Sequence, residues 1–113
     1  MIEKQIWTAI KSLFVGGVHY DVAPDSRTLP YATLQQVGGA SVNDLDGPDT
    51  LENPRIQIDV FAKTRLEANE LLKAAGAVLC SGPLKGVPLG APISTYNDDL
   101  KIYRRSQDFS FWL

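Results

Sequence analysis

The stretch PRIQIDVFAKTRLEANELLKAAGAVL, residues 54–79, changes from strand periodicity to helix periodicity within one segment. Its first part alternates apolar and polar residues, with Asp59 among the polar ones, as is typical of a strand with one buried face. Its second part has apolar residues at helical spacing, and Thr64 with Glu67 forms a capping box at the start of that part. The stretch therefore predicts a strand over 55–61 followed directly by an amphipathic helix.

The rest of the chain supplies one more helix and four more strands. The apolar residues of 2–14 lie on one arc of a helix that Gly16 and Gly17 end. Further strands are predicted at 18–22, at 30–37, at 93–96 and within 101–113. The order α-β-β-β-α-β-β, with its short connections, favours antiparallel pairing. We expect an α+β domain of two layers, with a mainly antiparallel sheet and two helices on one face.

Two segments lack a regular pattern. Residues 38–53 are expected to form a long acidic loop, because they carry Asp44, Asp46, Asp49 and Glu52 with three glycines, one proline and no basic residue. Such a loop either becomes ordered against a partner or stays solvated, and the sequence leaves both open. Residues 80–92 contain three prolines, which exclude a central strand.

The bulk properties narrow the functional classes. The 113 residues, with 44% hydrophobic composition, indicate one globular domain over 1–113. A net charge of −2 disfavours nonspecific nucleic-acid binding, which needs a basic surface. No apolar run approaches the roughly 18 residues of a membrane span, and the N-terminal residues lack a signal-peptide pattern. We therefore expect a protein that stays in the cytoplasm or in a particle assembled there.

Three candidate chemical sites are weak. A nucleophile pair of Cys80 and His19 is disfavoured because Cys80 is predicted at a helix C-terminus, where the dipole opposes a thiolate. A calcium loop fails because its first and twelfth ligand positions would be Val42 and Asn53. Asp59 has no second carboxylate or histidine beside it on its strand face, as a general base would need. We expect no catalytic, cofactor-binding or metal-binding residues.

The sequence gives better support to residues that make contacts between strands or between subunits. Arg104 and Arg105 are consecutive in the last strand, so each sheet face receives one of them. One of them is expected to pair with Asp59, either across strands or between subunits. Trp112 is predicted on the polar side of that strand, against a neighbouring strand or another subunit. The small-residue helix segment 74–77 is a candidate for the opposite contact patch.

Four segments together resemble a known family, the small tail-completion or tail-terminator proteins of siphophages and prophages. They are the N-terminal helix, VHYDVAPDSRTLPYATL (18–34), RIQIDVFAKTRLEANELLKAAGAVL (55–79) and YRRSQDFSFW (103–112). The resemblance covers nearly the whole chain and rests on residue patterns rather than on a catalytic signature.

The resemblance implies a non-enzymatic α+β subunit without cofactors. It implies a ring, commonly hexameric, at the head-proximal end of the tail, with the tail-tube protein and a head-completion or connector protein as partners. The location would be the virion tail, assembled in the bacterial host cytoplasm, and an isolated subunit is compatible with a monomer. Asp44, Asp46 and Asp49 would then suit a lumen through which DNA slides, since like charges repel.

The sequence leaves two other functional classes open. One is a small α+β ligand-binding or regulatory module in which residues 80–92 serve as a lid. The other is a hydrolase built on Cys80 and His19.

Overall fold

The protein is described from a computed structural model that covers residues 2–24, 28–43 and 50–112, without the side chains of 39–43 and 50–52. The elements in chain order are α1 (Ile2–Ile10), the short 3₁₀ helix η1 (Lys11–Leu13), β1 (Val18–Tyr20), β2 (Tyr31–Asn43), β3 (Thr50–Ala62), α2 (Arg65–Ser81), β4 (Val87–Asn97) and β5 (Ile102–Ser110). The order predicted from the sequence is confirmed.

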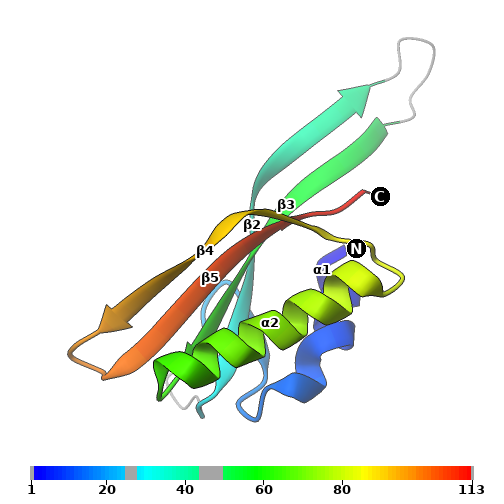
Figure 1. The fold of residues 1–113 in the computed structure, drawn as a ribbon. Coiled ribbons are helices and arrows are strands. Elements are labelled where there is room, and N and C mark those ends of the chain that lie inside the picture. Colours follow the sequence, from blue (N-terminus) through cyan, green and yellow to red (C-terminus); the bar gives the residue numbers. More distant parts are fainter. Residues whose placement is uncertain (1, 25–27, 44–49, 113) are drawn as a thin grey trace.

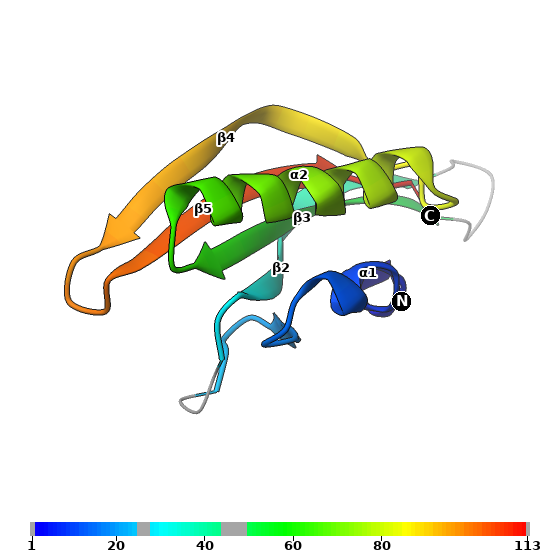
Figure 2. The ribbon, with the colours of Figure 1, turned by 60° about the horizontal axis from the view of Figure 1, so that its bottom comes forward.

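The described strands form one sheet in the order β1-β2-β3-β5-β4. Both helices lie on one face of it (Figure 1), and α2 runs along β3 and β5 (Figure 2). Three strand pairs are antiparallel, which confirms the mainly antiparallel α+β fold. The pair β1–β2 is parallel, against the antiparallel expectation, because β2 starts at the same end of the sheet as β1.

The core lies between the helices and the apolar face of the sheet. Thr64 caps α2 by accepting a hydrogen bond from the backbone N–H of Glu67 at 3.1 Å, as the capping box predicted. Burying each large apolar side chain contributes roughly 1.5–3 kcal/mol, which outweighs the weak propensity of such short helices. The buried residues of this core cluster are Ile2, Ile6, Ile10, Phe14, Val18, Ala32, Leu34, Ile56, Ile58, Val60, Ala62, Ala68, Leu72, Ala75, Leu79, Phe109 and Phe111.

The predicted loop over 38–53 is wrong for most of its length. β2 continues to Asn43, β3 begins at Thr50, and the two pair in an antiparallel register. Backbone pairing within the hairpin overrides the poor strand propensity of this glycine-rich, acidic segment. Gly38 lies in a bulge of β2 and has a φ of +124°, a conformation that favours glycine. Asp44, Asp46 and Asp49 lie outside the described residues.

The far half of this hairpin extends beyond the sheet. β5 ends opposite Arg55, so residues 37–43 and 50–54 form a two-stranded arm that projects from the body of the molecule (Figure 1). The principal extents are 53 × 27 × 24 Å and the radius of gyration is 14.9 Å, compared with about 13 Å for a compact domain of this size. The arm accounts for the elongation.

β4 is longer than the predicted strand at 93–96, because it begins at Val87. It is an edge strand of the sheet, and at such an edge Pro88 and Pro92 can be accommodated without loss of a ladder hydrogen bond. A bulge interrupts its pairing with β5, and the side-chain amide of Gln107 donates to the carbonyls of Leu89 at 3.0 Å and Gly90 at 3.1 Å. The alternative reading with residues 80–92 as a lid does not fit residues 87–92, which belong to β4.

Candidate functional site

The sheet face opposite the helices contains a charge pair between neighbouring strands. Arg104 on β5 donates from Nη2 to Oδ2 of Asp59 on β3 at 2.8 Å. Gln57 donates from Nε2 to both carboxylate oxygens of Asp59, at 2.9 and 3.2 Å. The carboxylate is thus held by an amide and a guanidinium, which offsets its desolvation. The predicted pair between Asp59 and one of the two arginines is confirmed for Arg104, within one chain.

Asp59 is buried, with 5% of its surface exposed, and so is its register partner Thr33 on β2. A strand with one buried face would leave Asp59 on the exposed side, so the burial of Asp59 departs from that pattern. Asp59 exposes little surface in the single chain, and a contact of Asp59 with a partner stays a prediction. Its carboxylate binds Arg104, whose side chain is 41% exposed.

Aromatic rings account for part of the burial on this face. Phe61 stacks on Tyr31 with ring centroids 4.6 Å apart and an angle of 14° between the planes. The guanidinium carbon of Arg104 lies 5.8 Å from the Phe61 centroid, and His19 meets Tyr31 edge-on at 6.1 Å. The arginine is therefore positioned by a carboxylate and by an aromatic face together.

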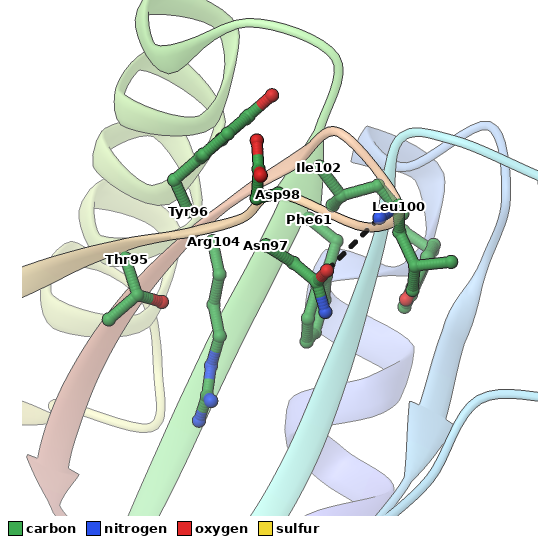
Figure 3. Close-up of a pocket in the computed structure, with 9 residues that line it drawn as sticks. Phe61, Thr95, Tyr96, Asn97, Asp98, Leu100, Ile102 and Arg104 are labelled. Atoms are coloured by element: carbon green, nitrogen blue, oxygen red, sulfur yellow. Dashed lines mark hydrogen bonds between the residues drawn. The ribbon is translucent and has the colours of Figure 1, made fainter.

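A cleft of about 490 Å³ opens beside this cluster, between β3 and the β4–β5 turn (Figure 3). In the turn, Leu100 donates its backbone N–H to Oδ1 of Asn97 at 3.0 Å. Leu100 is 54% exposed and Tyr96 is 46% exposed, so apolar surface faces solvent at the rim. The cleft is lined by Tyr31, Phe61, Thr95, Tyr96, Asn97, Asp98, Leu100, Ile102 and Arg104.

The other two arginines near β4 and β5 differ in their partners. Arg55 pairs with Asp108 at 2.7 Å on the same face as Arg104. Arg105 donates from Nη1 to the Ser94 hydroxyl and lines the helix side, in an apolar cleft between α2 and β4. The prediction that Arg104 and Arg105 serve opposite faces is confirmed.

Trp112 follows the end of β5 and is 59% exposed, while Phe111 beside it is fully buried. Its exposure disfavours the predicted packing flat against a neighbouring strand, and a contact with another subunit stays a prediction. The helix segment 74–77 is less suitable as a contact patch than expected, because Ala75 is fully buried in the core.

Cys80 and His19 have separate surroundings. Cys80 lies on α2 in the cleft toward β4, and burial raises the pKa of its thiol. His19 lies on β1, with Nε2 2.9 Å from the carbonyl oxygen of Gly16. β1 and β4 are the two opposite edges of the sheet, and a raised thiol pKa disfavours the thiolate that a nucleophile needs.

The described part of the chain contains neither a candidate metal cluster nor a membrane-spanning helix. No group of three or more histidine, cysteine, aspartate or glutamate side chains within it could hold a metal ion. None of the helices in the described ranges is long and apolar enough to cross a membrane.

Sequence reasoning missed the stack of Tyr31 on Phe61. The sequence does contain an indication of this stack. Phe61 lies on the same strand face as Gln57 and Asp59, so it is an aromatic residue among polar ones. An aromatic residue on a polar strand face indicates local cover.

Comparison with known proteins adds a family and a fold. The family model described as Tail completion protein gp17 matches residues 8–113. A chain from a structure titled "Virion of native gene transfer agent (GTA) particle" superposes with a TM-score of 0.68 at 19% identity, over 96% of this chain and 89% of that one. This likeness shows a shared fold. The comparison with curated proteins gives no match.

Proposed function

The chain belongs to the gp17 tail completion family, and from this premise we propose that it closes the head-proximal end of a phage tail tube as a ring and joins the tail to the head. A structural role in a phage tail follows from the family itself. The observation that carries the finer proposal is the family match over residues 8–113. The fold shared with a chain of a phage-like particle supports it.

A ring needs two different contact patches on each subunit, because it is a head-to-tail assembly closed by rotation. The two ends of this molecule differ strongly. One end carries the two-stranded arm, and the other carries the β4–β5 turn with the cleft beside Arg104. We propose a hexamer in the assembled tail, with Arg104 and Arg105 near β4 among its contacts and the isolated subunit monomeric in dilute solution.

The ends of the ring would meet two different partners. Trp112 is exposed at the end of β5, and tryptophan is enriched in protein interfaces. We propose that Trp112 contacts either the tail-tube protein or the head-completion or connector protein. Asp44, Asp46 and Asp49 would face the lumen, where repulsion between like charges keeps DNA from adhering.

The proposal is tested by removing the gene from the phage and counting products of infection in the host cytoplasm, where assembly would take place. We expect free filled heads and separate tails, with tails of irregular length, and restoration of joined virions when the protein is supplied from a plasmid. Normal numbers of joined virions without the protein would refute the proposed function.

A further inference from the structure

β4 forms a free edge of the sheet, and its two halves differ in their ability to pair with a further strand. The first half contains Pro88 and Pro92, and Gly90 between them has a φ of +72°. Proline and bulges are devices that blunt an edge strand against pairing. The second half, Ile93–Asn97, has neither proline nor glycine and pairs regularly with β5. Its outer side has no strand partner among the described residues.

This second half also exposes apolar side chains. Ile93 is 64% exposed and Tyr96 is 46% exposed, and all five residues of the half are exposed. A regular strand edge with unpaired backbone groups and apolar side chains is a site for strand addition, unless a partner covers it. The blunting of only the first half indicates that pairing is directed to Ile93–Asn97.

The opposite side of the sheet has a matching free edge. β1 pairs with β2 only at Ala32–Leu34, so β2 from Gln35 to Asn43 has β3 as its single strand neighbour within the described ranges. Beyond Arg55 the arm is a ribbon of two strands (Figure 1), and such ribbons are marginally stable in water without a third strand. The arm therefore gains most from a partner at its β2 edge.

We propose that the Ile93–Asn97 edge of one subunit pairs with the Gln35–Asn43 edge of β2 in a second copy of the chain. The proposal rests on the ring proposed above and specifies the contact that builds it. Because the two edges are different and lie on opposite sides of one sheet, each subunit offers one edge to each neighbour, as a head-to-tail contact requires. The sheet would then continue from subunit to subunit.

The distribution of charge favours a second copy as the occupant. Residues 38–53 hold four of the 13 acidic residues and none of the 11 basic ones, so the remaining chain has two more basic than acidic residues. Beside β4, Arg105 donates to the Ser94 hydroxyl rather than to a carboxylate. Like charges in segment 38–53 disfavour contact between two arms, whereas Arg105 offers a cation beside β4 to the acidic segment of a second copy.

Cross-linking in tails tests this contact. In a Cys80→Ser background, Thr95→Cys on β4 is combined with Gln35→Cys or with Ser41→Cys, near either end of the free β2 edge. Tails assembled with each variant are treated with a short bis-maleimide and resolved under denaturing conditions. We expect a ladder of covalent oligomers from at least one double variant, at least tenfold stronger than from any single-cysteine variant. Val87→Cys, in the blunted half of β4, replaces Thr95→Cys in the matched control and should give a much weaker ladder.

Each of the other cross-linking outcomes would refute a specific part of the proposal. Dimers from Thr95→Cys alone would show a symmetric β4–β4 contact and refute the head-to-tail pairing. Tails that contain the protein but give no ladder with either double variant would refute this contact and leave the proposed function intact. Tails assembled and joined without the protein would refute the proposed function, and this inference with it.

Discussion

Asp59 and Arg104 form a 2.8 Å ion pair between β3 and β5, in which the carboxylate is buried and the guanidinium reaches the surface. The buried carboxylate of Asp59 thus fixes the position of the Arg104 guanidinium at the edge of the cleft. A second pair of the same chemistry, Arg55 with Asp108 at 2.7 Å, is more exposed and serves as its natural comparison.

Asp59→Ala should destabilise the fold by about 1–3 kcal/mol, because it removes the partner of Arg104 and of the Gln57 amide in a buried place. Asp108→Ala should cost at most about 1 kcal/mol, as is usual for exposed pairs. Chemical denaturation monitored by tryptophan fluorescence measures both. An equal decrease in the free energy of unfolding in the two variants would contradict the greater burial of the Asp59–Arg104 pair.

Two glycines should respond to alanine in opposite directions. In α2, a Cβ at Gly76 would meet Phe109 at 3.6 Å, an ordinary contact, so Gly76→Ala should stabilise by up to about 1 kcal/mol through helix propensity. A Cβ at Gly16 would lie 1.6 Å from the Thr28 carbonyl oxygen, so Gly16→Ala should cost at least about 2 kcal/mol. Thermal unfolding of both variants provides the measurement. A Gly16→Ala variant as stable as the parent would show that the loop packs elsewhere.

The thiol of Cys80 should react slowly with iodoacetamide in the native protein. Burial raises the pKa of this thiol above its ordinary value, so at about pH 8–9, close to that ordinary value, the folded chain has less thiolate than the unfolded chain. The same shift makes folding more favourable below the unfolded pKa, and this contribution is lost as pH rises through the folded pKa. Mass spectrometry of alkylation with and without denaturant checks the prediction. Equal rates in the two states would contradict it.

Trp112 should matter for assembly and not for folding. Because it is 59% exposed, Trp112→Ala should change the free energy of unfolding by less than about 0.5 kcal/mol and reduce joined virions at least tenfold. Phe111→Ala is the matched control, since that ring is fully buried and its loss should cost about 3–5 kcal/mol. Normal numbers of joined virions with Trp112→Ala would remove this residue from the contact surface.

The sequence predicted those parts of the fold that depend on local patterns. The alternation in 55–61 and the capping box at Thr64 specify β3 and α2 because side-chain periodicity and cap chemistry are local. The arm was missed because glycine and acidic residues are poor strand formers, and only pairing between residues such as Ser41 and Glu52 reveals it. The burial of Asp59 was missed because its neighbours in the sheet, Thr33 and Arg104, are distant in sequence.

Cryo-electron microscopy of purified tails tests the central claim most directly. The account predicts a closed ring of copies of this chain at the head-proximal end of the tube, with the α+β fold described here in each subunit. A map in which that end lacks the chain, or in which the chain is distributed along the tube, would contradict the account.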